Sequence, residues 1–274
     1  MAVIPPDIFS NAEALNQFFD PDKFDSPVLG IATCYDSPVA HTPRAGLHSH
    51  SKGQLTFTRQ GCTHIELCNQ VCIIPPYRAV WIPAHTLHKT VQHHNVEFRS
   101  IYLDMNEFPQ LPAKIEVMSL SPLLKELVER IAFSDFETNW FQDRQYNLLQ
   151  VFIDEICAAP RQPMLLPLPQ DSRMKPLLDI LKQQALPPQL QKLSSRIGAS
   201  ERTICRIFSR ETGMNYRSWR QQWRLMRSLE LMSNRVSLST ISSTLEFNSD
   251  SAFVAFFKQY TGTTPGSYIQ ELRC

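Results

Sequence analysis

The sequence predicts an α+β protein of two domains, a β-rich N-terminal domain and an all-α C-terminal domain. Short β-rich runs separated by turn residues fill about the first 118 residues, and apolar residues at helical spacing dominate beyond residue 171. Four prolines among the thirteen residues 159–171 separate these two patterns. A length of 274 residues is comfortable for two hydrophobic cores.

Seven runs of β-branched and aromatic residues predict the strands of the N-terminal domain, residues 1–158. The last run alternates, which places Phe98, Ser100 and Tyr102 on one face of a sheet. The close spacing of the runs predicts a small barrel or sandwich. The predicted strands are 28–35, 54–58, 63–67, 71–74, 79–82, 90–92 and 96–103.

Two amphipathic helices, 121–133 and 141–158, complete the N-terminal domain. Ser121 is placed to cap the first helix, and Pro122 is favoured at its first position. Each helix has one apolar face. Such a pair packs either against the sheet domain or against its counterpart in a second subunit, and the spacing fits both arrangements.

The prolines of 159–171 predict an extended linker, and the charge changes sign across it. Residues 172–274 contain 15 Lys and Arg against 7 Asp and Glu, a net charge of +8. Residues 1–171 contain 12 against 19, a net charge of −7. This asymmetry favours a polyanion partner for the C-terminal domain, with a solvated Arg-rich surface as the alternative.

Residues 190–213, at about these bounds, have the apolar spacing of two helices joined by a tight turn. Gly198 can adopt the positive φ that ends the first helix, and Ser200 can cap the second. The same layout returns 48–49 residues later, at about 239–262. The sequence therefore predicts two helix-turn-helix units.

A long helix is predicted between the two units, at Tyr216–Ser233. Trp219, Trp223 and Met226 form its apolar stripe, and its arginines lie mostly off that stripe. A rigid connection of this kind would fix the distance between the two units, as binding to two major grooves about 34 Å apart requires.

An extended motif covers the whole of 173–274. Its residues are Ser200-x-Arg-Thr-Ile-x-Arg-Ile-Phe-x-x-Glu-Thr-Gly213, Arg224-Leu225, Phe247, Phe253-x-x-x-Phe257-Lys, Gly262-x-x-Pro265 and Tyr268. In these residues the chain resembles the AraC family of transcription regulators. The resemblance implies a tandem helix-turn-helix domain that binds double-stranded DNA. One position departs from the family, because Glu246 stands where a glycine usually precedes Phe247.

The resemblance also implies which side chains face DNA. They are Arg202, Thr203, Cys205 and Arg206 on the first recognition helix, and Asp250, Ser251, Val254, Ala255 and Lys258 on the second. Arginine can pair bidentately with guanine, whereas valine and alanine offer only methyl contacts. We therefore expect the first unit to read sequence and the second mainly to hold the DNA backbone.

All eight histidines lie between residues 41 and 94. Because alternate strand residues point inward together, His48, His50 and His88 are expected to share a cavity. Residues 41–103 resemble a cupin barrel, and we expect Arg78 and Trp81 near its mouth, with a core position as the alternative for Trp81. The predicted effector pocket consists of His48, His50, Gln54, Arg78, Trp81 and His88.

Three interpretations of the histidines stay open. They form a pocket for a small organic effector, or a site for a divalent transition metal on His48, His50 and His88, or a structural cluster. Gln54 stands where metal-binding cupins usually have Glu, and an amide lacks the charge that helps to hold a divalent ion.

The predicted function is a sequence-specific DNA-binding transcription regulator whose barrel senses a small molecule or a metal. The alternative is a cupin-type metal-dependent enzyme fused to a DNA-binding domain, but the chain lacks a Gly-rich phosphate loop, Gly-x-Ser-x-Gly and His-Glu-x-x-His. We expect no enzymatic activity, and a homodimer is the expected assembly. Without a membrane-length apolar run or a secretory signal, a cytoplasmic location is predicted.

Overall fold

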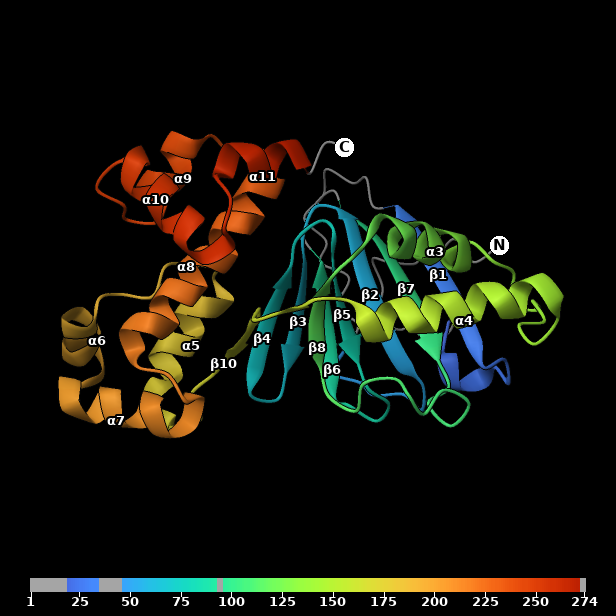
Figure 1. The fold of residues 1–274 in the computed structure, drawn as a ribbon. Coiled ribbons are helices and arrows are strands. Elements are labelled where there is room, and N and C mark those ends of the chain that lie inside the picture. Colours follow the sequence, from blue (N-terminus) through green and yellow to red (C-terminus); the bar gives the residue numbers. More distant parts are fainter. Residues whose placement is uncertain (1–18, 35–45, 93–95, 272–274) are drawn as a thin grey trace. The chain divides into compact units, whose positions relative to one another are not determined.

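The chain divides into two compact units in the computed structural model, which describes residues 19–34, 46–92 and 96–271. The first unit comprises Met1–Cys68 and Ile74–Pro163, and the second comprises Asn69–Ile73 and Met164–Cys274. Figure 1 shows strands and two helices in the first unit and a set of helices in the second. Within the described ranges no helix combines the length and the apolar character needed to cross a membrane.

Ten strands of the described chain form two sheets. Their bounds are β1 Val28–Cys34, β2 Gly53–Gln60, β3 Thr63–Leu67, β4 Gln70–Ile74, β5 Arg78–Ile82, β6 His88–Gln92, β7 Glu97–Leu103, β8 Glu116–Ser119, β9 Arg161–Gln162 and β10 Leu165–Pro167. The six-stranded sheet is antiparallel throughout and has the order β1-β7-β2-β5-β8-β9. The four-stranded sheet has the order β10-β4-β3-β6.

Each of the seven predicted strands is found, with shifts of one or two residues at its ends, and residue 35 lies outside the described residues. The sequence patterns missed β8, β9 and β10. β10 lies in the proline-rich segment and pairs with β4 at the edge of its sheet, with Pro167 opposite Gln70. An edge strand tolerates proline because half of its backbone groups need no partner strand.

Two helices, α3 (Pro122–Ala132) and α4 (Asp143–Ala158), pack on one face of the six-stranded sheet (Figure 1). The Ser121 hydroxyl accepts a hydrogen bond from the Leu124 amide at 3.0 Å, which confirms the predicted cap. Gly30 on β1 is required by this packing, because an added Cβ would lie 2.0 Å from the carbonyl oxygen of Ile131. The helix pair therefore completes the core of the first unit.

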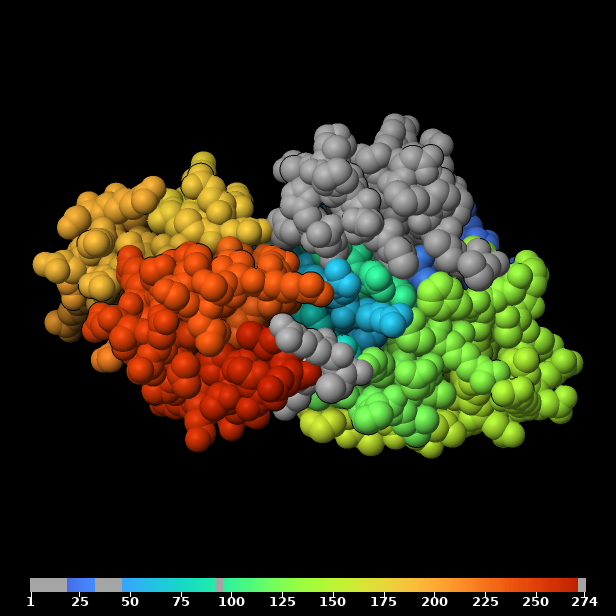
Figure 2. All heavy atoms as spheres, turned by 90° about the horizontal axis from the view of Figure 1, so that it is seen from above, coloured from blue at the N-terminus to red at the C-terminus, as the bar shows by residue number. Residues whose placement is uncertain are grey.

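The second unit contains the helices α5 Lys175–Lys182, α6 Leu190–Ile197, α7 Glu201–Thr212, α8 Tyr216–Ser233, α9 Leu238–Thr244, α10 Asp250–Thr261 and α11 Pro265–Glu271. The predicted bounds of α8 are confirmed, and Trp219, Trp223 and Met226 of its apolar stripe are buried. The space-filling view shows these helices in colours from yellow at α5 and α6 to red at α11 (Figure 2). The two predicted helix-turn-helix units are α6 with α7 and α9 with α10.

Candidate DNA interface and histidine cluster

The first helix-turn-helix unit has the local structure that its sequence predicts. Gly198 ends α6 with a φ of 65°, in the left-handed region that glycine adopts without strain. The Ser200 hydroxyl accepts from the Thr203 amide at 3.2 Å and so caps α7. The buried side chains Leu193, Ile204 and Phe208 hold the two helices together.

Arg202 and Arg206 form an exposed pair on α7. They are four residues apart, so they lie on the same face of the helix. Neither has an ion-pair partner in the part of the chain that the structure describes, which leaves both guanidinium groups available to an external anion. Cys205 beside them is half-buried, and the Thr203 hydroxyl lies 3.0 Å from that of Ser200, so Thr203 belongs to the cap.

The second unit closes its turn with Glu246, whose φ is 55°. This is the position of the missing family glycine, and the turn forms because the Phe247 amide donates to the Ser242 carbonyl at 2.8 Å. Arginines of α8 support it. The Arg220 guanidinium pairs with the Glu246 carboxylate at 2.7 Å, and Arg224 donates to the Glu246 carbonyl at 3.1 Å.

Arg224 is buried, and its guanidinium lies 3.6 Å from the centre of the Phe247 ring. Burial lowers the pKa of Arg224 to about 10, so the side chain stays charged at neutral pH. Arg227 of the same helix pairs with Glu230. Sequence reasoning missed the structural role of Arg220 and Arg224, because their partners Glu246 and Phe247 come from a distant turn.

The second recognition helix, α10, offers less positive charge. The Ser249 hydroxyl caps it, and the Ser242 hydroxyl donates to the Asp250 carboxylate, which braces α9 against α10. Ser251 and Ala255 are exposed and Val254 is half-buried. Lys258 is exposed near the end of the helix.

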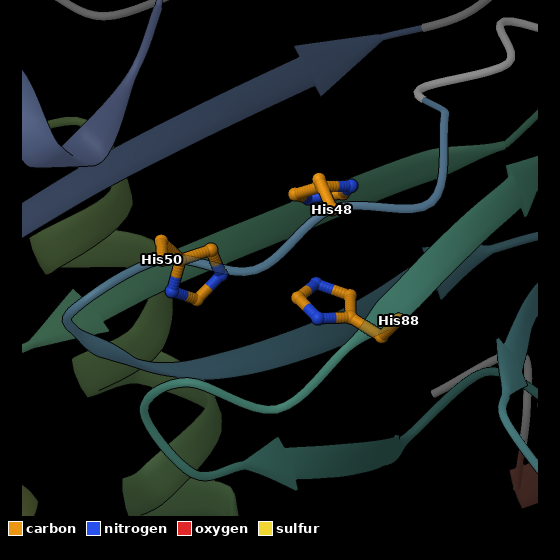
Figure 3. A group of neighbouring side chains, drawn as sticks. All are labelled: His48, His50 and His88. Carbon is orange, nitrogen blue, oxygen red and sulfur yellow. The ribbon is translucent and has the colours of Figure 1, made fainter.

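The predicted histidine cluster is present in the first unit. One ring nitrogen from each of His48, His50 and His88 lies within 4.8 Å of the others, and Figure 3 shows the three rings turned toward one another. His50 and His88 are buried, and His48 is half-buried. An isolated bridge between His48 and His88 holds their backbones together, with amide-to-carbonyl distances of 3.0 and 2.9 Å.

Each of the three rings has its Nδ1 beside a backbone carbonyl. The distances are 2.8 Å from His48 to Gly46, 2.5 Å from His50 to Lys52 and 2.8 Å from His88 to Thr86. Burial, together with the neighbouring rings, lowers the pKa of His88 to about 4, and burial likewise lowers the pKa of His50. Both rings are therefore neutral at pH 7, the form that a metal ion requires.

Gln54 on β2 connects this cluster to β7. Its Oε1 lies 3.1 Å from His50 Nε2 and 3.0 Å from His88 Nε2. Its Nε2 donates to the Ser100 hydroxyl at 2.8 Å and to the Tyr102 hydroxyl at 3.2 Å. The predicted neighbours His50, Gln54 and His88 are thus brought together in a polar interior.

Trp81 and Arg78 lie apart from this cluster. In the pairing of β2 with β5, Trp81 is opposite Leu55, whereas Gln54 is opposite Ile82, so Trp81 and Gln54 are on different faces of the sheet. Trp81 is fully buried in the core under α3 and α4, which is the alternative given above. Arg78 is at the other end of β5, and its side chain donates to the Tyr77 carbonyl.

The chain resembles known regulators in sequence. Residues 193–271 match the model of a helix-turn-helix domain family. Over 255 residues the chain is 28% identical to the HTH-type transcriptional regulator NimR of Escherichia coli, covering 93% of this chain and 92% of NimR. It is 25% identical over 122 residues to the HTH-type transcriptional regulator RipA of Corynebacterium glutamicum, covering 44% of this chain and 35% of RipA.

Two of the solved structures that align with the chain do so with low TM-scores. ToxT of Vibrio cholerae aligns with a TM-score of 0.36 and 12% identity over 90% of this chain and 98% of ToxT. The DNA-binding domain of AdpA, solved with a target DNA, aligns with a TM-score of 0.35 and 22% identity over 38% of this chain and 95% of that domain. The alignment with NimR spans both compact units.

Proposed function

We propose that this chain is an AraC-family transcription regulator that binds DNA through its tandem helix-turn-helix domain, and that the two helix-turn-helix units bind DNA unequally. The first unit reads base sequence through Arg202 and Arg206, and the second binds mainly the phosphate backbone. The observation that carries this proposal is the exposed, unpaired arginine pair on α7. At the corresponding positions of α10 stand Ser251 and Ala255.

Selection of binding sites from random duplexes, followed by binding measurements at several salt concentrations, tests this division. Arg206→Ala should lose about 1–3 kcal/mol at one base pair and relax the sequence preference there. Lys258→Ala should weaken binding to selected and random DNA alike and reduce the salt slope by about 1. Equal losses on both DNAs for Arg206→Ala would contradict the assignment of Arg206 to sequence reading.

We also assign effector sensing to the polar interior of the N-terminal compact unit, around Gln54. The hydroxyl groups of this interior, among them those of Ser100 and Tyr102, offer the few convergent polar groups that a small-ligand site needs. An effector bound there would shift the balance between DNA-binding and non-binding states of the protein. Thermal-shift measurements on the full chain with metals and small molecules test this assignment.

A homodimer is the assembly that we propose. Large apolar side chains are exposed on or beside α3 and α4, at Leu123, Phe133, Phe141, Tyr146 and Val151. A second copy of the same helix pair would bury them in a symmetric contact. Sedimentation of the Val151→Glu variant, compared with the unaltered protein, tests this assembly: the variant should sediment as a monomer.

A further inference from the structure

We propose that a cavity at the junction of α3 and α4 binds a small dianionic oxyanion of the phosphate type. Residues 133–142 join the two helices, and the cavity lies where α3 ends and α4 begins. This site is separate from the interior around Gln54, because Trp140 at the cavity packs in the same core as Trp81, on the other face of the six-stranded sheet. The inference does not rest on the proposed function.

The lining of the cavity is rich in hydrogen-bond donors, and its only charges are positive. Its polar side chains are those of Arg130, Ser134, Thr138, Trp140, Arg144 and Gln145, and no acidic residue of the described chain is among them. A guanidinium group and an indole N–H can only donate hydrogen bonds. The lining therefore suits a negatively charged ligand that is rich in acceptors.

Trp140 gives the clearest indication that the cavity takes a ligand. Its side chain is buried, with 3% of its surface exposed, and within the described ranges its Nε1–H has no hydrogen-bond partner. A buried indole N–H usually has a partner, because an unsatisfied buried donor costs free energy. An oxyanion in the cavity would supply the missing acceptor.

Arg130 and Arg144 supply the charge. Arg130 stands in the last turn of α3 and Arg144 in the first turn of α4, and both are exposed. Neither has an ion-pair partner among the residues that the structure describes. Two guanidinium groups match a phosphate group, which carries a charge of about −1.5 to −2 at pH 7, better than a carboxylate with its single charge.

The start of α4 adds to this positive field. Gln142, at the N-cap position, makes no side-chain hydrogen bond to the first turn of the helix. A helix N-terminus without a side-chain cap favours an anion, because its first amides and the helix dipole both point a positive charge at it. Asp143, the acidic residue of this turn, is exposed and does not line the cavity.

The size of the cavity limits its occupant. Its volume is about 140 Å³, whereas pockets for drug-sized ligands measure about 300–1,000 Å³. A nucleic acid backbone is disfavoured, because residues 1–171 have a net charge of −7. The occupant is therefore a free ion or a small phosphate monoester.

NMR spectra of the full-length protein with isotope-labelled tryptophan test the inference, because each of the four indole N–H groups gives its own signal. Titration with inorganic phosphate at constant ionic strength should move the signal that Trp140→Phe removes. The signals of Trp81, Trp219 and Trp223 should persist in this variant, which shows that it folds.

Substitution of an arginine ties the signal to the site. Arg144→Gln should weaken phosphate binding about tenfold or more, because a hydrogen bond to a charged group is lost. Arg59→Gln is the matched control and should leave binding unchanged, since Arg59 is exposed on β2 of the same compact unit and lies outside the cavity. An unmoved Trp140 signal, or a movement that Arg144→Gln does not weaken, would overturn the inference.

Comparison of ligands fixes the chemical class and its source. Acetate should bind at least about tenfold more weakly than phosphate, because its single charge leaves one guanidinium group unmatched. Equal binding of acetate would overturn the assignment to a dianion. Glycerol phosphate separates the two sources of the phosphate group: tighter binding than that of inorganic phosphate assigns the site to a monoester, and weaker binding assigns it to the free ion.

Discussion

The two helix-turn-helix units close the same turn with different residues. Gly198 ends the first helix of one unit with a φ of 65°, and Glu246 does so in the other with a φ of 55°. This conformation costs a residue with a Cβ about 1–2 kcal/mol and costs glycine almost nothing. The second turn is therefore strained and needs support from elsewhere, which the first does not.

The arginines of α8 provide that support. Arg220 pairs with the Glu246 side chain, and Arg224 bonds the Glu246 carbonyl while stacking on Phe247. These cations are occupied within the protein, so the net charge of the domain overstates the charge that DNA meets. What remains exposed on the recognition helices favours the first unit, through Arg202 and Arg206.

The largest effect that we expect from this difference is on stability. Arg224→Ala removes the bond to the part-buried Glu246 carbonyl and the stacking contact with Phe247, and it leaves a cavity where the buried guanidinium lay. We expect the free energy of unfolding to fall by about 2–4 kcal/mol, measured by urea denaturation. Arg217→Ala, in the same helix but exposed, is the control and should change it by less than about 0.5 kcal/mol.

A smaller effect separates the two turns themselves. Gly198→Ala should cost about 1–2 kcal/mol, all of it backbone strain, because an added Cβ there meets nothing within 4 Å. Glu246→Gly should be close to neutral, since the strain it relieves offsets the lost ion pair with Arg220. Glu246→Ala keeps the backbone strain and loses the ion pair with Arg220, so it should be the less stable of the two Glu246 variants. A large loss in Glu246→Gly would show that the turn is held mainly by Arg220.

The turn of the first helix-turn-helix unit was predictable from sequence because its residues act locally. The turn of the second helix-turn-helix unit was less predictable because it depends on distant partners. Gly198 and Ser200 act on their own backbone and its near neighbours, so their roles can be read from the residues alone. The role of Glu246 depends on Arg220, 26 residues away. The same limit applies to the N-terminal compact unit, where alternation indicated the histidine cluster but could not reveal that Gln54 bonds Ser100 and Tyr102 across strands.

The strand pattern was similarly informative only where a face was buried. Seven strands with apolar or alternating residues were predicted, whereas β9 and β10 are only two and three residues long and lie in the proline-rich segment. The sequence prediction placed Trp81 near a pocket because its segment lies between Pro75 and Pro83, which is typical of a loop at the mouth of a barrel. Its pairing with Leu55 decides its face, and pairing is a tertiary property.

Transferring a side chain from one unit to the other tests the difference in DNA reading. Ala255 occupies the position in α10 that Arg206 occupies in α7, so Ala255→Arg gives the second unit a cation. Binding to random duplexes should tighten by up to about fivefold, and the salt slope should steepen by about 1. Ala255→Gln, which adds length without charge, is the control. No gain for Ala255→Arg would show that α10 does not approach DNA.

The smallest effect concerns a contact that only the first unit has. The Glu211 carboxylate accepts from the backbone amides of Gln170 and Asp171 at 2.8 and 3.0 Å, whereas the corresponding residue of the second unit is Tyr260. The side-chain bond from Arg210, and then the two amides, lower the pKa of Glu211. A lowered pKa contributes stability that is complete above the ordinary value of 4.5 and is lost as the pH falls through the lowered value.

Glu211→Gln removes this contribution, so the variant should be slightly less stable than the unaltered protein at neutral pH. The difference should shrink below about pH 4.5 and disappear at the acid end of the transition, because both chains then carry an uncharged side chain at this position. Urea denaturation at a series of pH values measures this difference. A stability difference of the same size at all pH values would mean that Glu211 acts through packing and not through its charge. The first helix-turn-helix unit would then have no charge-dependent contact with residues 170 and 171.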